Sequence, residues 1–147
     1  MAYGTATSFT ITLASLVSAA ARQSTEIDNT SNLYTDVMIE VKVKTAAATT
    51  ASAHVNVYAF ANVNDLRSGG AGASDAAITL QSPPNVTLLG AISTPTASST
   101  YTSKGFQLGA AFGGAIPAKW GIVVENQTGQ ALDGTEGNHA YAYRGRS

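Results

Sequence analysis

A strict alternation of apolar and polar side chains constrains the fold of this chain more than any other feature of its sequence. In the segment Tyr34–Val43, β-branched residues occupy every second position and mostly charged residues lie between them: Val37, Ile39, Val41 and Val43 against Asp36, Glu40 and Lys42. Successive side chains of a β-strand point to opposite faces of the sheet. The pattern therefore predicts a strand with one face in a hydrophobic core and the other face in water.

The same two-residue period recurs along most of the chain. The segment His54–Val63 alternates around Val55 and Val57, and we expect both of its faces to be partly covered. Six further segments have the composition of short strands: Thr5–Leu13, Ala77–Gln81, Val86–Ile92, Tyr101–Ala111, Trp120–Asn126 and His139–Arg144. The sequence thus predicts about eight strands.

Residues that favour turns and loops separate these segments. The turn signals are Asn64-Asp65, Ser68-Gly69-Gly70, Pro83-Pro84 and Asp133-Gly134, and the stretches Ala46–Ser52 and Thr94–Ser103 are rich in Ala, Ser and Thr. Leu13–Arg22 has a helical composition, and we predict at most one or two helical turns there. Regularly spaced short strands without alternating helices indicate an all-β fold, an antiparallel β-sandwich of jelly-roll type. A length of 147 residues predicts a single domain over residues 1–147.

The composition excludes several classes of partner and of chemistry. Only 12% of residues are charged and the net charge is −1, so we expect neither nucleic acid nor a membrane surface as a partner. The apolar stretch Phe9–Ala21 could pass for a secretion signal, but Phe9, Ile11 and Leu13 alternate as in a strand. The absence of cysteine removes disulfides, thiolate zinc ligands and thiol catalysis together.

Residues able to carry catalysis are few and poorly spaced. His54 and His139 are the only histidines, and neither has a metal-binding partner two or four positions later. Glu26, Asp28 and Asp36 form the densest acidic group, for which solvated surface charge is the favoured interpretation over a bound cation. The Gly-rich segment Ser68–Ser74 lacks the ending of a phosphate-binding loop. We therefore predict a protein that is not an enzyme, with no catalytic, cofactor-binding or metal-binding residues and no cofactor.

The aromatic residues divide between core and surface interpretations. Trp120, Phe9, Phe106 and Phe112 are expected to pack in the core or on a sheet. Tyr141 and Tyr143 share one face of the last predicted strand, where core packing and an interface role both remain open.

Three segments resemble those of small structural proteins in the virions of tailed bacteriophages. They are SFTITLA (Ser8–Ala14), STEIDNTSNLYTD (Ser24–Asp36) and AKWGIVVENQTGQALDGTEGNH (Ala118–His139). The resemblance implies a capsid decoration or cement protein, a β-sandwich assembled in the host cytoplasm and located on the capsid exterior of the virion. It implies binding to the major capsid protein, and self-association as a homo-oligomer. Among closed oligomers we expect a homotrimer, because icosahedral shells offer threefold positions.

Two alternatives from other classes stay open at this level. One is a structural protein of the phage tail or neck, which copy number distinguishes from decoration: hundreds of copies per particle for decoration and about a dozen for a neck. The other is a carbohydrate-binding β-sandwich module, which would expose aromatic side chains such as Tyr58, Tyr101, Tyr141 or Trp120.

Overall fold

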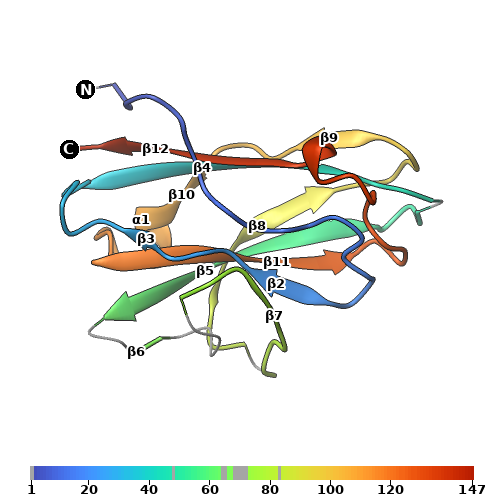
Figure 1. Cartoon of the computed structure of the whole chain (residues 1–147), viewed down its shortest axis with the longest axis horizontal. Helices are drawn as coiled ribbons and strands as arrows, with labels where there is room; N and C mark the ends of the chain where they lie inside the picture. The colour runs from blue at the N-terminus through green and yellow to red at the C-terminus, as the bar shows by residue number, and fades with distance from the viewer. Residues whose placement is uncertain (1, 48, 64–65, 68–72, 83) are drawn as a thin grey trace.

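Two antiparallel β-sheets form the molecule, and little helix accompanies them. The computed structural model describes residues 2–47, 49–63, 66–67, 73–82 and 84–147, with 43% strand and 5% helix. Figure 1 shows the two sheets as stacked layers. The predicted all-β sandwich is confirmed, and its jelly-roll connectivity stays a prediction. Neither helix of the described ranges, α1 (Leu108–Ala111) nor the 3₁₀ turn η1 (Glu136–Asn138), is long and apolar enough to cross a membrane.

The first sheet is built around the long strand β4 (Asp36–Lys44). Its order is β1-β12-β4-β10, with β9 also paired to β4. The other members are β1 (Thr7–Ser8), β12 (Ala140–Arg146), β10 (Phe106–Gln107) and β9 (Thr100–Thr102). Because β12 and β4 pair over seven residues, from Ala140 opposite Lys42 to Arg146 opposite Asp36, they fix the register of this layer.

The second sheet is built around the pair β5 (His54–Val63) and β11 (Lys119–Gln127). Its order is β6-β5-β11-β2-β7, with β3 also paired to β11 and β8 to β5. The shorter members are β6 (Leu66–Arg67), β2 (Ala21–Gln23), β7 (Ala76–Ile78), β3 (Ile27–Asp28) and β8 (Thr87–Ser93).

Alternating side chains of the two sheets form the core between the layers. Eight residues predicted to be buried have no exposed surface: Val37, Ile39, Val41, Val43, Val55, Val57, Ile122 and Val124. The aromatic predictions are also confirmed, since Trp120 and Phe106 are buried and Phe9 and Phe112 pack against the same cluster. Tyr143 belongs to this core, and Tyr141 packs against its edge.

The second sheet is covered on both faces in its centre, as expected for β5. Phe60 and Val123 form a smaller cluster with Ala21 and Val86 on the face away from the main core. Gly121 makes this packing possible, because a Cβ at that position would collide with the ring of Phe60 and lie 2.8 Å from the Ser24 hydroxyl oxygen. A residue with any side chain would push Phe60 out of its position.

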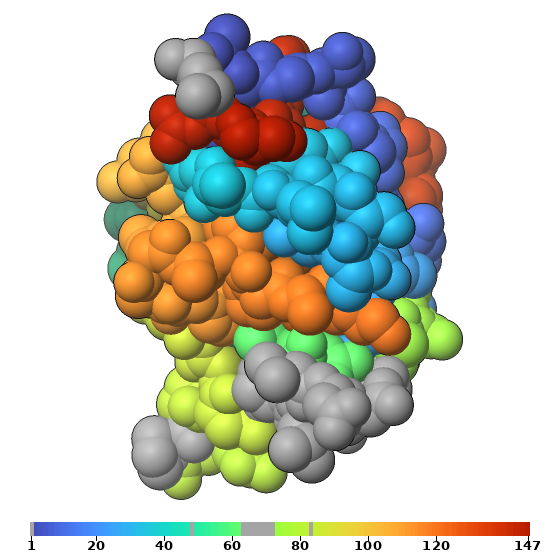
Figure 2. Space-filling model, turned by 90° about the vertical axis from the view of Figure 1, so that its left-hand side faces the viewer, coloured from blue at the N-terminus to red at the C-terminus, as the bar shows by residue number. Residues whose placement is uncertain are grey.

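Both chain ends lie at the same end of the sandwich. The Gly4 amide donates to the Gly145 carbonyl at 2.9 Å. The Tyr3 hydroxyl donates to Asp36, and the Arg146 guanidinium pairs with the same carboxylate and lies over the Tyr3 ring. Figure 2 looks onto this end, where the blue N-terminal residues lie against the red C-terminal strand.

The predicted strand Thr5–Leu13 is wrong in extent, because only Thr7 and Ser8 pair as a strand. The alternation of burial continues beyond them, since Ile11 and Leu13 are buried between exposed threonines. Backbone partners explain the difference. The Thr10 carbonyl accepts from Thr25, and the Leu13 amide donates to the Glu136 side chain, so no single neighbouring strand accompanies this segment.

The helical turns allowed for Leu13–Arg22 do not form. Ser15 and Ala19 have φ angles of 58° and 62°, which a right-handed helix does not accept. Long-range hydrogen bonds hold these tight turns, since the Ser15 amide donates to the Asp133 carbonyl and the Ala19 amide to the Asn126 carbonyl. The stretch ends in strand β2, which we did not predict.

The predicted strand Tyr101–Ala111 is divided into β9, β10 and α1. The Ser103 hydroxyl accepts a hydrogen bond from the Val41 amide at 3.0 Å and so takes the place of a backbone acceptor, which ends the regular ladder. Gly105 then brings the chain against the Met38 side chain, where no Cβ would fit. The short strands β3 and β6 were also not predicted.

Several predicted turns lie partly or wholly outside the described residues. These are Asn64-Asp65, Ser68-Gly69-Gly70, the first part of Ser68–Ser74, and Pro83. The described part of Ala46–Ser52 forms no named strand, as predicted. Thr94–Ser103 is a loop as far as Ser99, where β9 follows.

Replacement of Ile39 by alanine should leave a cavity in the centre of the main core. Ile39 has no exposed surface, so the expected loss in free energy of unfolding is about 2–5 kcal/mol, measured by urea denaturation. Val17→Ala is the matched control, since Val17 is 60% exposed and its truncation should change stability by less than about 0.5 kcal/mol. Equal losses in both variants would contradict the assigned core.

Candidate functional site

A groove crosses the outer face of the first sheet over β12 and β4. Val41 of β4 and Tyr143 of β12 point into the core. Glu40 and Ala142 are their neighbours in sequence and are paired with each other, so both point outward. The groove has a volume of about 420 Å³ and is lined by Ser8, Phe9, Glu40, Lys42, Thr102, His139, Ala140, Tyr141 and Ala142. Two alanines on the outer face of β12 leave the space that larger side chains would fill.

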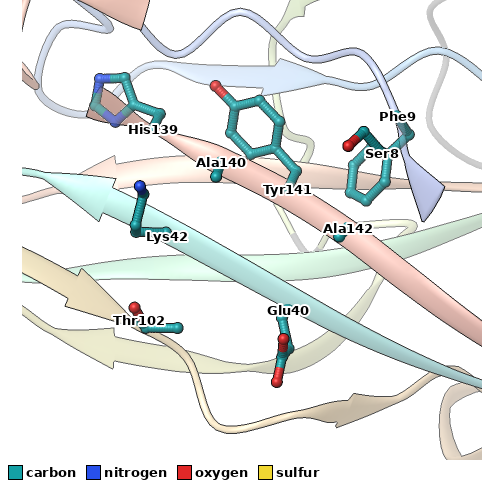
Figure 3. A pocket seen from close by; sticks show the side chains of 9 residues that line it. All are labelled: Ser8, Phe9, Glu40, Lys42, Thr102, His139, Ala140, Tyr141 and Ala142. Carbon is teal, nitrogen blue, oxygen red and sulfur yellow. The ribbon is translucent and has the colours of Figure 1, made fainter. Parts of the chain in front are cut away.

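The two sides of the groove differ in chemistry. Figure 3 shows Glu40, Lys42 and Thr102 on the side of β4 and β9, and Ala140 and Ala142 on the side of β12. The Tyr141 ring is on the inner face of β12, because Tyr141 is paired with the buried Val41, and it packs beside Phe9 against the core. Glu40 and Lys42 are two positions apart on β4, so opposite charges lie on the same face of one strand. The groove thus offers small residues, two opposite charges and hydroxyl groups to a binding partner.

His139 is fixed as a structural residue beside this groove. The Lys44 amide can only donate, and it donates to Nδ1 of His139 at 3.2 Å. Nε2 therefore carries the ring proton and donates to the Asp133 carbonyl at 3.0 Å. Since both ring nitrogens bind backbone atoms and the residue is 5% exposed, neither nitrogen is free to act as a general base.

The segment that precedes β12 contains two carboxylates, Glu136 and Asp133, that hold neighbouring parts of the chain together. These parts are the N-terminal segment, β12 and the end of β4. Glu136 accepts hydrogen bonds from the Leu13 and Ala14 amides at 2.9 and 2.7 Å and from the Tyr141 hydroxyl. Burial and the adjacent Glu136 carboxylate raise the pKa of Tyr141. Glu136 thus adds a side-chain link between the N-terminal segment and the start of β12.

Asp133 is the second carboxylate of this fastening. It accepts from the Asn138 side chain at 2.8 Å and from the Thr135 amide at 2.9 Å, and Lys44 lies 3.4 Å away. These hydrogen bonds, with the Lys44 charge, lower the pKa of Asp133 to about 2. Asp133 therefore stays ionised at neutral pH and holds the turn before η1.

The structure places the acidic residues considered at the sequence level in separate surroundings. Glu26 accepts a hydrogen bond from Asn62 at 2.6 Å, Asp28 binds Thr30 in its own loop, and Asp36 pairs with Tyr3 and Arg146. Within the ranges that the structure describes, no three His, Asp or Glu side chains gather as metal ligands would.

His54 stands at the other end of β5 from Asn62, the partner of Glu26. Its Nδ1 lies 2.9 Å from the Ser52 carbonyl oxygen in its own loop. The histidine is thus part of a local turn contact.

The aromatic residues named for a glycan-binding surface do not share one face. Trp120 has no exposed surface, which agrees with its predicted place in the core and excludes it from the exposed face that the carbohydrate-binding alternative requires. Tyr58 binds Glu125 through its hydroxyl on the second sheet, and Tyr101 binds Thr96 beside β9 on the first. Burial is the main cause that raises the pKa of Tyr58, followed by the Glu125 contact. The half-buried Tyr141 belongs to the fastening at Glu136.

Sequence reasoning missed both the groove and the two fastening carboxylates. The turn at Asp133 had a local signal, since an aspartate that accepts from the amide two residues later is a common turn motif. Glu136 had no such signal, because its partners Leu13 and Ala14 are more than 120 positions away in the chain.

Replacement of Glu136 by alanine should loosen the N-terminal segment at Leu13 and Ala14. The Leu13 and Ala14 amides would lose their acceptor, so the free energy of unfolding should fall by about 1–3 kcal/mol, and amide exchange should accelerate at both residues. Glu40→Ala is the matched control, because the exposed Glu40 side chain should contribute less than about 0.5 kcal/mol. Unchanged exchange at Leu13 and Ala14 in the Glu136 variant would count against the fastening.

Replacement of Asp133 by asparagine should weaken the fold in a pH-dependent manner. The folded-state pKa of about 2 lies below the unfolded value of about 3.9, so the stabilisation by this carboxylate is present above about pH 4 and is lost as the pH falls towards 2. The stability difference between wild type and variant should therefore narrow over that range in urea denaturation. A difference that stays constant with pH would contradict the assignment.

Comparisons with known proteins identify no relative of this chain. No protein-family model, curated protein or solved structure gives a significant match to the chain.

Proposed function

We propose that the protein is a structural component of a tailed-phage particle, a decoration protein that binds the outer surface of the major capsid protein shell and stabilises it. The proposal combines the resemblance of three sequence segments with the chemistry of the described surface. It assigns the protein a binding role and no catalytic one.

The three resembling segments form one bonded framework in the fold. Glu136, in the third segment, accepts from Leu13 and Ala14 in the first. The Ser24 amide donates to the Ile122 carbonyl at 2.9 Å, which joins the second segment to the third. The resemblance therefore concerns the parts that hold the sandwich together, which supports a shared structural role.

One observation carries the proposal: His139, Glu136 and Asp133 hold the fold together through hydrogen bonds beside an open groove. The side chains there with acid-base chemistry bind backbone atoms or tyrosine, whereas the groove itself offers small residues and two opposite charges. Paired charges at the border of a contact fix its orientation more than its strength. We place the contact with the shell at this groove.

We propose a homotrimer on two grounds, the low charge of the chain and the symmetry of a shell. With only 12% charged residues, the chain has few charges to keep its surface solvated, and a shared interface would cover part of that surface. A trimer on a threefold position can make the same contact with each surrounding subunit, so that three weak contacts act together.

The purified chain should behave as a trimer and rebind particles from which it has been removed, at hundreds of copies per particle by the logic of symmetric assembly. Ala140→Arg should abolish most rebinding, because the long side chain fills the groove. Thr100→Arg is the matched control, since Thr100 is exposed on the same sheet but does not line the groove. Cosedimentation and light scattering measure both properties.

Three outcomes would overturn parts of this proposal. A monomer at high concentration would exclude the trimer. A copy number of about twelve per particle would favour a neck or tail protein. Equal rebinding of the Ala140 and Thr100 variants would remove the groove as the shell contact.

A further inference from the structure

Asp133 and Gly134 form the only pair in the chain in which aspartate or asparagine precedes glycine. Such a pair is prone to isomerisation, because glycine has no side chain to shield its amide nitrogen from the preceding side-chain carbon. The nitrogen attacks that carbon, a five-membered succinimide forms, and hydrolysis of this ring gives mostly isoaspartate. Gly134 is exposed, so water reaches the pair. The chemistry of the pair therefore favours the reaction, and the fold decides how often it occurs.

The fold holds both oxygens of the Asp133 carboxylate. One oxygen accepts from the Asn138 side chain at 2.8 Å and from the Thr135 amide at 2.9 Å, and the other lies 3.4 Å from the Lys44 ammonium. Cyclisation needs a neutral carboxyl group, from which one oxygen can leave as water. The Asn138 hydrogen bond and the other donors, with the Lys44 charge, instead stabilise the ionised form and lower the pKa of Asp133 to about 2. The folded carboxylate is therefore kept in its unreactive protonation state.

The peptide group between Asp133 and Gly134 is fixed as well. The Asp133 carbonyl accepts from the Ser15 amide at 3.1 Å and from Nε2 of His139 at 3.0 Å. This carbonyl oxygen and the Gly134 nitrogen belong to one planar peptide group. Rotation of the nitrogen towards the side-chain carbon must therefore turn the carbonyl away from both of its donors. Two sets of hydrogen bonds thus oppose the reaction, one on the carboxylate and one on the peptide group.

We propose that Asp133 and Gly134 form an isomerisation site that the folded turn keeps closed and that reacts when the turn over residues 133–138 opens. In the reaction the Gly134 nitrogen forms a bond to Cγ of Asp133, and its proton leaves with the carboxyl OH group as water. A second water then adds to the backbone carbonyl carbon of Asp133 and breaks its bond to the Gly134 nitrogen. The chain now runs through Cβ and Cγ, and the former backbone carbonyl has become a carboxylate.

Conversion changes a structural acceptor beside the groove. The backbone becomes one methylene longer at Asp133, and the acceptor of Ser15 and His139 becomes an oxygen of a free carboxylate. Since His139 lines the groove and its Nδ1 accepts from the Lys44 amide, the change should loosen the groove where β4 and β12 meet it. Reaction at this site therefore records local opening of the turn in covalent form. The inference goes beyond the proposed function and does not depend on it.

The folded protein should isomerise at Asp133 at least about tenfold more slowly than the same chain unfolded in guanidinium chloride, because the folded turn must open first. Both samples are aged at neutral pH and physiological temperature, and trypsin then releases residues 120–144 as one peptide. Liquid chromatography separates the isoaspartyl form, and electron-transfer fragmentation locates the extra backbone methylene. Equal rates in the folded and unfolded samples, or no isoaspartate at Asp133 in the unfolded chain, would overturn the inference.

Three variants identify what closes the site. Asn138→Ala removes one donor to the carboxylate, so isomerisation at Asp133 in the folded protein should become about tenfold faster. Asn85→Ala is the matched control, since Asn85 is exposed in a different loop and its truncation should leave the rate unchanged. Gly134→Ala should suppress the reaction even in the unfolded chain, because the added methyl group shields the attacking nitrogen.

Circular dichroism verifies that the Asn138 and Asn85 variants are folded. Equal rates in these two folded variants would show that the hydrogen bonds of the turn do not control the site, and would remove the inference. Because the comparison of folded and unfolded wild type needs no substitution, it decides the question even if the Asn138 variant fails to fold.

Discussion

The packing of β-branched side chains between β4 and the pair β5 and β11 is the interaction on which the rest of the structure depends. Residues such as Val41, Val57 and Ile122 have no exposed surface, and the chain has no cysteine and only 12% charged residues to replace their contribution. Burial of a valine or isoleucine side chain contributes about 1.5–3 kcal/mol. The relative position of the two sheets is fixed by this layer, and the shorter strands are added at its borders.

Several polar side chains accept hydrogen bonds from backbone amides in the segments around that layer. Glu136 and Asp133 replace backbone partners where the chain cannot continue a ladder, and Ser103 does the same beside Val41. A buried or half-buried amide without a partner is costly, so each of these side chains allows a tight turn that would otherwise be unfavourable.

Strands with uninterrupted alternation could be predicted from the sequence, whereas segments with scattered partners could not. Val37 to Val43 needs only one rule, since every second residue enters the core. Ser15 and Ala19, by contrast, adopt left-handed turns because of hydrogen bonds to Asp133 and Asn126, which lie far away in the chain. The candidate groove could not be predicted for a related reason. Ala140 lies opposite Lys42 only because β12 pairs with β4, and these two residues are almost a hundred positions apart in the chain.

The common position of the two chain ends has a practical consequence for protein engineering. Because Gly4 is hydrogen-bonded to Gly145 at one end of the sandwich, a short linker can join the termini without crossing the molecule. New ends can then be opened at Gly113 and Gly114, where an added Cβ would meet no neighbouring atom within 4 Å. A circularly permuted chain of this kind would carry fused cargo at a different place on the same unaltered sandwich.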